Sequence, residues 1–595
     1  VFSSVICAYV LFLCPSMTRY LWDSFKDKSY SNHNLMTFGF GDGGGGPTYE
    51  MMENYERLKY GLPGFPKTKV ETTGEFFDRQ EENFRKTSKE LKKEPKWVGE
   101  LYLEAHRGTY TSLGKNKRNN RKSELLYQQA ETLAVTDMIL LGGSYPEEIF
   151  RKNQTKILLN QFHDIIPGSS IKDVYDITDI EYAEILKDGR VIADSMKNKI
   201  QSSLKTAGGV FVYNPTPFEI TDYVKCDGNS YLAENVPAHG WKIVSDTPVK
   251  NNIFVGSNVI ENYLIKITFN EKYHLSSIFD KTENREILTG EGNILQIFED
   301  YPRDYDAWEI TDYYNQKMWV ADDVSDVTLL ENGLEITRKY QKSLLRQKIT
   351  LRPNSKRVDF DTYVDWHEDH VLLKAAFPVD IRSDVATYDI QFGNLKRPTH
   401  KNTKWDEAKF EVCAHKWADL SENGYGVSIL NDCKYGYSIE ENIMKITLLK
   451  AATYPNPDAD RGEHIFTYSL YPHIGDFSQG GTVKEGYLLN MPLEATFVKA
   501  NDGKLSDCFS IASSNKENVV VETIKKAEDD NSIIIRAYET YNSKVTAEIT
   551  VGFDFKKVYL CDMLENNQIE LTFKDKTVSL PFKNFEIITL KFELK

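Results

Sequence analysis

Residues 160–170 read NQFHDIIPGSS, and they mark the point where a helical segment meets a turn. The preceding run IFRKNQTKILLNQF, which begins at Ile149, spaces apolar residues three and four positions apart and predicts an amphipathic helix. Pro167 and Gly168 then predict a turn. His163 and Asp164 lie between the two, where an imidazole can ligate a divalent metal and a carboxylate can bind hydroxyl groups. Taken alone, the pair also fits a structural histidine beside a helix-terminal carboxylate.

Helical periodicity extends on both sides of this stretch and predicts a helical bundle over residues 69–205. Its four segments are EFFDRQEENFRKTSKELKK (75–93), SELLYQQAETLAVTDMILL (123–141), PEEIFRKNQTKILLNQF (146–162) and VYDITDIEYAEILKDGRVIADSMKNKIQSSL (174–204). A basic tract, KNKRNNRK at 115–122, precedes the second segment. We interpret the tract as a solvated face.

Upstream, LMTFGF at 35–40 predicts a short buried strand, and Thr48 with Glu50 predicts a capped helix start. The glycine-rich loop between them lacks the spacing and the Lys-Ser/Thr of a nucleotide-binding loop. Two interpretations of it stay open. The glycines provide positive φ angles for the loop itself, or they let a ligand approach the backbone with Asp42 pointing into a crevice.

After Gly208–Gly209 the pattern changes to alternating apolar and polar residues between turn signals, which is typical of antiparallel sandwich strands. Nine segments carry it: VFVYNP, YLIKITF, QKITL, RVDFDTYVDW, FTYSLYP, NVVVETIKKA, SIIIRAYE, KVTAEITVGF and FEIITLKFEL. The SQGG turn at 478–481 predicts a boundary between a large and a smaller β-domain.

The charge balance limits the class of partner. The chain has 73 basic and 88 acidic residues, a formal charge of −15, which argues against a nucleic-acid partner and against an anionic membrane surface. A neutral ligand fits better, and the 34 Tyr, 31 Phe and 8 Trp include candidates for packing against sugar rings. The sequence leaves association into a homo-oligomer open.

Seven scattered cysteines form no CxxC pair, which is typical of a reducing compartment and predicts a cytoplasmic location. The N-terminal run VFSSVICAYVLFLC is too short to span a bilayer and lacks a charged region and an initiator Met. We interpret the chain as starting inside a longer protein, with residues 1–20 of uncertain origin.

NQFHDIIPGSSIKDVY (160–175) resembles the segment that closes the catalytic site in α-mannosidases of glycoside hydrolase family 38, in the branch with cytosolic and bacterial members. Further stretches resemble the same branch in the same order. They are FGFGDGGGGPT (38–48), GELYLEAHRGTYTS (99–112), DIQFGNLKRPTHKNTKWDEAKFEVCAHKWADL (389–420) and YPNPDADRGEHIFTYSLYPH (454–473).

This resemblance implies a multidomain α+β fold. We expect the end of an α/β catalytic domain at 1–68, a helical bundle at 69–205 and a small β segment at 206–250. A large β-sandwich domain at 251–478 and a C-terminal β-sandwich domain at 479–595 would follow. The N-terminal part of the catalytic domain would lie outside this chain.

The resemblance also implies a metal-dependent, retaining hydrolysis of terminal α-mannosides in oligosaccharides. Members of the family bind Zn²⁺, or another divalent ion such as Co²⁺, at the sugar hydroxyls, which orients the ring. Of the family's ligands, only the histidine of the His-Asp motif has a counterpart here, and it is His163. A single imidazole does not hold zinc, since such sites take at least three protein ligands. We therefore expect this chain to be an inactive fragment.

Other site residues follow from the resemblance. Asp164 would bind substrate hydroxyls, and Asp42 falls where related enzymes carry an acid/base carboxylate, although Gly43 replaces the second carboxylate of that region. His106 would line the substrate wall, where other branches place a stacking aromatic, with Arg107 and Tyr110 in the same loop. Packing behind the residues that touch substrate is the alternative for His106, and a loop-stabilising role is the alternative for Asp42.

In the β-domain, five residues lie in motifs too polar for strand interiors: Arg397, His400, Trp405, Asp460 and Arg461. Other branches use an arginine from this region at the substrate, and Arg461 is our candidate for that role. An interdomain ion-pair network is the alternative.

Two rival functions remain. A non-catalytic carbohydrate-binding protein would use the β-domains and their aromatic residues without a metal. A structural β-sandwich protein would explain the C-terminal half but not GDGGGGP or NQFHDIIPG.

Overall fold

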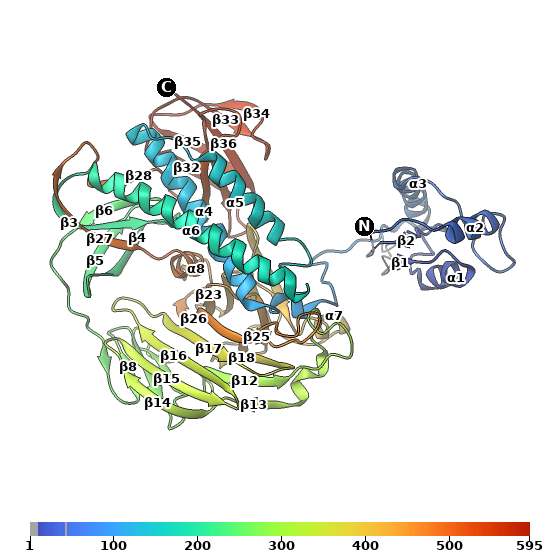
Figure 1. Ribbon diagram of the computed structural model, residues 1–595, viewed down its shortest axis with the longest axis horizontal. Coiled ribbons are helices and arrows are strands. Elements are labelled where there is room, and N and C mark those ends of the chain that lie inside the picture. Colours follow the sequence, from blue (N-terminus) through green and yellow to red (C-terminus); the bar gives the residue numbers. More distant parts are fainter. Residues whose placement is uncertain (1–9, 42–43) are drawn as a thin grey trace. The chain divides into compact units, whose positions relative to one another are not determined.

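The computed structural model describes residues 10–41 and 44–595. The chain divides into two units, Val1–Tyr102 and Leu103–Lys595. Helices dominate the first unit and the beginning of the second, and antiparallel strands follow to the C-terminus (Figure 1). The multidomain α+β class predicted from the sequence is therefore confirmed.

The first unit carries three helices and a two-stranded sheet among its described residues. Thr48 caps the second helix by accepting a hydrogen bond from the Met51 amide, as its sequence predicts. The strand predicted for 35–40 is shorter than expected, because only its last two residues pair with a neighbouring strand. The elements are β1 (Val10–Leu11), α1 (Pro15–Ser24), β2 (Gly39–Phe40), α2 (Tyr49–Leu58) and α3 (Thr73–Leu91).

The division between the units corrects the extent of the bundle. Helix α3, expected to be its first member, lies in the first unit. Three long helices form the bundle in the second unit, after a short 3₁₀ helix: η1 (Arg107–Tyr110), α4 (Gly114–Leu141), α5 (Glu147–Asn160) and α6 (Lys172–Ser202). The three helices share one apolar core, which includes Tyr127 and Ala134 of α4, Phe150 of α5, and Tyr182 and Ile185 of α6.

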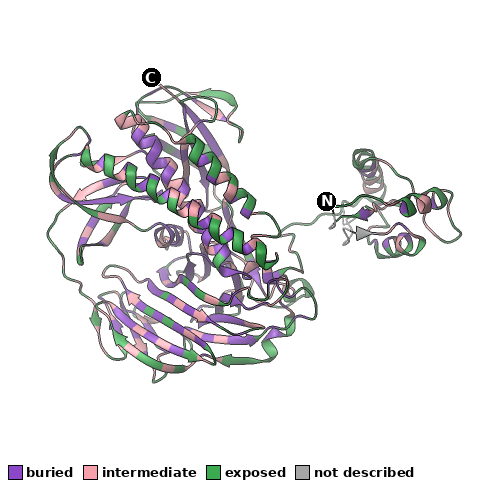
Figure 2. Cartoon of the chain, viewed as in Figure 1, coloured by how far each residue is buried: buried purple, intermediate pink, exposed green. Residues whose placement is uncertain are grey.

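Helix α4 begins well before the predicted segment and includes the basic tract. Our interpretation of that tract as a solvated face is wrong, since Lys117 and Arg121 are buried. The reason is that several neighbours enclose α4: Tyr127 packs with the other helices, Val135 packs in the core of the C-terminal strands, and Arg121 contacts Asn431 in the large β-region. Figure 2 shows α4 buried along most of its length, whereas α6 has a long exposed face.

Three sheets fill residues 254–474. The nine-stranded sheet runs in the order β14 (Asp323–Leu329), β15 (Gly333–Tyr340), β16 (Ser343–Leu351), β17 (Val358–Trp366), β26 (Gly462–Ile474), β23 (Tyr425–Asn431), β22 (Trp417–Glu422), β19 (Val385–Ile390), β20 (Gly393–Pro398). The six-stranded sheet runs β13 (Met318–Val320), β12 (Ile294–Glu299), β18 (Val371–Pro378), β25 (Ile443–Lys450), β24 (Gly436–Glu440), β21 (Val412–Cys413). The five-stranded sheet runs β11 (Arg285–Glu286), β10 (Leu275–Asp280), β9 (Ile265–Phe269), β8 (Val259–Glu261), β7 (Phe254–Val255).

The two larger sheets pack face to face as a sandwich. Phe360 of β17 lies 5.6 Å from Phe377 of β18, ring centroid to ring centroid, and all three rings of the group Phe360, Phe377 and Tyr468 are buried. Every strand pair in these sheets is antiparallel, as the alternating pattern predicts. Two short helices flank them, η2 (Asp312–Gln316) and α7 (Lys404–Glu407).

The segment after the bundle is not a separate β unit, because its strands pair with residues near 500. The four-stranded sheet runs β27 (Glu494–Asp502), β3 (Lys205–Asn214), β6 (Gly240–Val244), β28 (Cys508–Ser510), and β4 (Ile220–Cys226) pairs with β5 (Asn229–Val236). Helix α8 (Thr482–Asn490) precedes β27. The chain expected as 206–250 and 479–595 therefore shares a sheet.

A smaller sandwich ends the chain around a core that includes Val521, Ile535 and Ile549. One sheet runs β29 (Ala512–Ser514), β32 (Val545–Val551), β35 (Thr577–Phe582), and the other runs β30 (Val519–Lys526), β31 (Ile533–Glu539), β36 (Ile587–Leu594), β33 (Phe555–Cys561), β34 (Asn567–Leu571). Among the helices of the described residues, none is long and apolar enough to cross a membrane.

Candidate active site

His163 and Asp164 form the exposed tip of the turn that follows α5. Their side chains are 78% and 53% exposed, and His163 Nε2 lies 3.4 Å from Asp164 Oδ2. The His163 ring packs against the Phe162 ring, with 4.3 Å between the centroids. Both polar groups are therefore available to a ligand, and the neighbouring aromatic ring restricts the imidazole.

Below the tip, the base of the turn is fixed by the first turns of α4. The Lys117 ammonium donates to the carbonyls of Ile166 (2.9 Å), Pro167 (3.0 Å) and Ser112. Asn116 Nδ2 donates to the Ile165 carbonyl at 3.0 Å. Burial lowers the pKa of Lys117 to about 7. Two side chains of the tract thus bond three consecutive carbonyls of the turn, and Lys117 is the donor to those of Ile166 and Pro167.

Side-chain bonds also hold both ends of the turn. Before it, Gln161 Nε2 donates to Asn120 Oδ1 (3.0 Å) and Glu124 Oε1 (2.7 Å), both on α4. After it, Ser170 Oγ donates to the Asp164 carbonyl at 2.7 Å, and Tyr175 donates to the Ile165 carbonyl at 3.1 Å. The backbone at His163 and Asp164 is therefore held by three helices, although the two side chains take no part in these bonds.

Gly168 permits the close approach that this arrangement needs. Its φ of +90° is a conformation that side-chain-bearing residues rarely adopt. A Cβ at this position would lie 2.4 Å from the Ser112 carbonyl oxygen. The Pro167–Gly168 turn signal therefore reflects contact with residue 112 as well as local turn geometry.

The segment before α4 is fixed in turn by the large β-region. The Asp460 carboxylate accepts hydrogen bonds from the Leu113 and Gly114 amides, each at 2.7 Å. Ser112 Oγ donates to the Ala307 carbonyl at 2.6 Å, and the Gly108 amide donates to the Trp308 carbonyl at 2.8 Å. Asp460 thus satisfies amides at the N-terminus of α4, where a carboxylate also interacts favourably with the helix dipole.

The three candidates from residues 106–110 have different environments. His106 is exposed, has a φ of +63° and donates its amide to Glu309 at 3.3 Å. Arg107 is buried, where its guanidinium donates to the Glu104 and Ala408 carbonyls and stacks on Phe410. Tyr110 lines a cavity beside the turn. The structure therefore gives Arg107 protein partners, while His106 stays accessible.

The polar β-domain candidates have local partners as well. Arg461 forms an ion pair with Asp369, and Arg397 donates to the Cys413 carbonyl at 2.9 Å and lies over the Tyr388 ring. His400 Nδ1 lies 3.7 Å from Asp406 Oδ2, and Trp405 is exposed. Asp42 lies outside the described residues.

A metal ion would find an incomplete donor set at the tip. His163 offers an imidazole and Asp164 a carboxylate, and zinc sites take at least three protein ligands. Across residues 10–41 and 44–595, no group of three or more His, Cys, Asp or Glu side chains is placed to hold a metal. These residues by themselves do not fit a zinc site.

The supporting residues were missed from the sequence, although a signal was present. Lys117, Asn120 and Glu124 are spaced three, four and seven residues apart, and Asn116 directly precedes Lys117, which places the four on one side of the helix. The charge of the 115–122 tract predicted a solvated face, and the helical spacing of its polar residues was not used. A polar face at helical spacing beside a His-Asp turn would have predicted the support.

Four segments of the chain match four domains of one family, in order. They are the glycosyl hydrolases family 38 N-terminal domain (14–100), the alpha mannosidase middle domain (104–200), the family 38 C-terminal domain (260–458) and the family 38 C-terminal beta sandwich domain (518–590). The chain belongs to glycosyl hydrolase family 38, as its resemblance predicts.

Similar proteins agree with this assignment. The chain is 34% identical to human alpha-mannosidase 2C1 over 96% of its own length and 57% of that protein. It is 33% identical to an alpha-mannosidase of Saccharomyces cerevisiae over 91% of its length and 52% of the relative. The chain thus spans little more than half of these curated relatives. The crystal structure of an alpha-mannosidase from Enterococcus faecalis shares the fold, with a TM-score of 0.76, 14% identity and coverage of 96% of this chain and 77% of that one.

Proposed function

We propose that this chain is part of a metal-dependent, retaining α-mannosidase that removes terminal α-mannose from oligosaccharides. One observation carries the proposal. The turn of residues 161–168 is held by α4, α5 and α6, yet it leaves the imidazole of His163 and the carboxylate of Asp164 exposed. The family membership and the alpha-mannosidase relatives support the substrate class.

In this proposal the tip binds and orients the sugar. The Asp164 carboxylate accepts hydrogen bonds from substrate hydroxyls, and its fixed backbone limits the entropy lost on binding. His106 is exposed, and in this proposal its imidazole lines the substrate wall. Asp42 and Arg461 remain candidates for the acid/base group and a substrate contact.

Zinc, or cobalt in its place, is the proposed cofactor, with His163 as one ligand. A bound divalent ion would supply charge that orients the sugar hydroxyls. Because the described residues offer fewer than three ligands at the tip, the other ligands would come from sequence that the longer relatives have and this chain does not span. We further propose that residues 1–595 alone do not hydrolyse α-mannosides.

A hydrolysis assay tests both parts. The purified chain is incubated with a chromogenic α-mannoside and Zn²⁺ or Co²⁺, with folding checked by circular dichroism. A folded chain without activity is expected. Hydrolysis that a chelator abolishes would overturn the proposed inactivity, and hydrolysis that survives both the chelator and His163→Ala would overturn the metal site.

The acidic charge and scattered cysteines support a cytoplasmic enzyme acting on neutral free glycans. Among the described residues, Cys14, Cys226, Cys433, Cys508 and Cys561 form no disulfide.

A further inference from the structure

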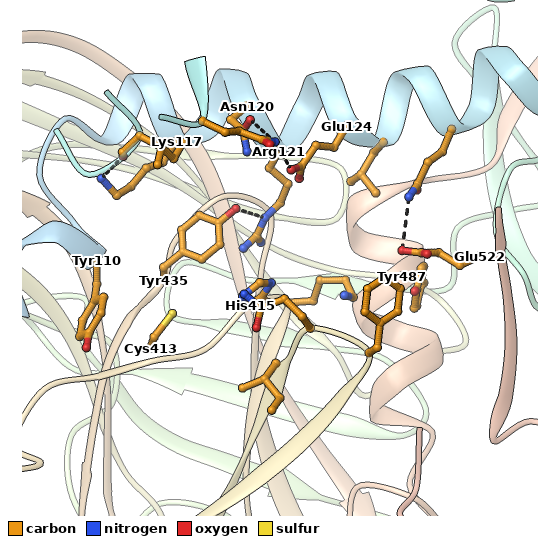
Figure 3. Close-up of a pocket in the computed structure, with 18 of the residues that line it drawn as sticks. Tyr110, Lys117, Asn120, Arg121, Glu124, Cys413, His415, Tyr435, Tyr487 and Glu522 are labelled. Carbon is orange, nitrogen blue, oxygen red and sulfur yellow. Dashed lines mark hydrogen bonds between the residues drawn. The ribbon is translucent and has the colours of Figure 1, made fainter. Parts of the chain in front are cut away.

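A cavity of about 690 Å³ lies on the other side of the turn from its tip. Gln161, Ile166 and Pro167 line it, whereas His163 and Asp164 do not. The remaining walls come from α4, from the turns and strands of the large β-region, and from α8, β30 and β31 of the C-terminal region. Figure 3 shows the α4 side chains facing His415, Tyr487 and Glu522 across the space. Its volume is in the range of small-ligand sites, about 300–1,000 Å³.

Two basic groups at this cavity are already used by the fold. Lys117 donates to three backbone carbonyls, and Arg121 donates to the Tyr435 hydroxyl, to Asn431 and to the Lys434 carbonyl. Neither the Arg121 guanidinium nor the Lys117 ammonium is therefore free to bind an anion. A phosphate or carboxylate entering here would also meet the carboxyl groups of Glu124 and Glu522.

Other polar groups keep unused hydrogen-bonding capacity. The His415 ring has no hydrogen-bond partner among the described residues, and burial lowers its pKa to about 3, so it stays neutral. The Glu522 carboxyl group accepts one hydrogen bond from the described residues, from Gln128 Nε2 to Oε1 at 3.3 Å. Its second oxygen, Oε2, accepts none from them. Burial raises the pKa of Glu522 and of Glu124. Lys416 lies 3.2 Å from Asp389 and over the Tyr487 ring, which leaves room for a further acceptor.

Aromatic rings complete the lining. Tyr487 and Tyr538 share a hydrogen bond between their hydroxyls at 2.9 Å, and Tyr435 lies across from them beside His415. A saccharide presents apolar C–H faces as well as hydroxyls, so it needs flat rings together with donors and acceptors. A strongly charged ligand needs an excess of one sign, which the free groups here do not supply.

We propose that this cavity is a second saccharide-binding site, which takes a neutral sugar through Glu522, His415 and Lys416 and is separate from the His163–Asp164 tip. The turn of residues 161–168 is the wall between the two sites. Binding here does not depend on the proposed hydrolysis.

Binding of methyl α-mannoside and mannotriose to the full chain tests this site, by calorimetry and by saturation-transfer NMR. Glu522→Gln retains an acceptor for Gln128 but alters the carboxyl group, and Lys416→Met removes a donor at similar volume. Each is expected to weaken binding at least tenfold. Gln391→Trp, in an exposed hairpin turn at the cavity, is expected to block binding by filling space. His367→Ala, at an exposed histidine in the large β-region, is the control and is expected to change the affinity less than twofold.

The proposal fails if neither neutral sugar binds to the folded parent chain, or if His163→Ala removes the binding. It also fails if the three cavity variants bind like the parent, or if inorganic phosphate or a diamine competes with the sugar. Circular dichroism and the unfolding midpoint confirm that each variant is folded. A chain that binds sugar here but hydrolyses nothing separates this inference from the proposed activity.

Discussion

The two faces of the 161–168 turn differ in how far their polar groups are hydrogen-bonded by the rest of the protein. At the tip, His163 and Asp164 are exposed and contact mainly each other and Phe162. At the base, three successive carbonyls are bonded by buried side chains of α4. Many interactions thus fix a backbone whose two most reactive side chains contribute little to packing. This combination is expected of a functional surface, because ligand groups must be positioned and yet accessible.

The two aspartates Asp164 and Asp460, which are far apart in the sequence, show the same contrast between an exposed and a bonded polar group. Asp164 is exposed, whereas Asp460 is 2% exposed and binds two amides at the start of α4. Both belong to motifs that resemble the family. Only the second is committed to holding the helix on which the turn rests.

Removing the Asp460 carboxylate should have the largest effect. Asp460→Ala leaves two buried amides without their acceptor and removes the carboxylate charge near the Lys117 ammonium, and we expect a loss of about 3–5 kcal/mol in unfolding free energy. Hydrogen exchange should accelerate first at Leu113 and Gly114. Asp458→Ala, an exposed neighbour, is the control and should change stability by less than about 0.5 kcal/mol. Equal effects of the two changes would contradict the capping role.

Gly168→Ala tests whether the base of the turn needs the close approach to Ser112. We expect a loss of about 2–3 kcal/mol, from backbone strain at positive φ and from the contact with the carbonyl. Gly228→Ala is the matched control, since Gly228 has a φ of +81° but no atom within 4 Å of a Cβ. It should cost about 1 kcal/mol. Thermal unfolding measures both, and the difference between them isolates the contact.

Lys117→Met should cost about 1–3 kcal/mol, because it leaves buried carbonyls without a donor. The cost should depend on pH. Burial lowers the pKa of Lys117 from 10.5 to about 7, so between these values the unfolded chain retains a proton that the folded chain has released. The stability contributed by this position therefore rises with pH from about 7 toward 10.

We would measure the unfolding midpoints of the parent and of Lys117→Met at several pH values between about 7 and 10. The difference between the two cancels the contribution of other titrating groups, because they are the same in both proteins. Lys115→Met, an exposed position on the same helix, is the control and should show no such trend. A difference that falls as pH rises would contradict the lowered pKa.

His163→Ala should have the smallest effect on stability, within about 0.5 kcal/mol, because its side chain is exposed. In the longer protein proposed above, which would supply further ligands, it should in contrast reduce Co²⁺ or Zn²⁺ binding at the tip, measured by spectroscopic titration. His367→Ala, at an exposed histidine in the large β-region, is the control. A large loss of stability in His163→Ala would assign the imidazole to packing and remove the contrast between the two faces.

Local signals in the sequence were sufficient for much of the fold. The apolar spacing at 146–162 predicts α5, the Thr48 cap predicts α2, and alternation predicts strands such as β17 and β31. These features depend on neighbours within a few residues, so one segment contains the information. The His163–Asp164 turn was found in the same way, from a helix end followed by Pro-Gly and from its resemblance to the family.

Long-range packing decided the rest. Whether residues 115–122 are solvated depends on which elements cover α4. Arg121 of this tract, for example, donates to Asn431, which lies 310 residues further along the chain. Similarly, Asp460 finds its amides 347 residues away, and β3 pairs with β27 across the whole large β-region. The sequence by itself determined most of the elements, the family and the pair of residues at the tip. Only the tertiary structure decided which polar groups are buried, because burial is set by surfaces that the chain brings together from distant segments.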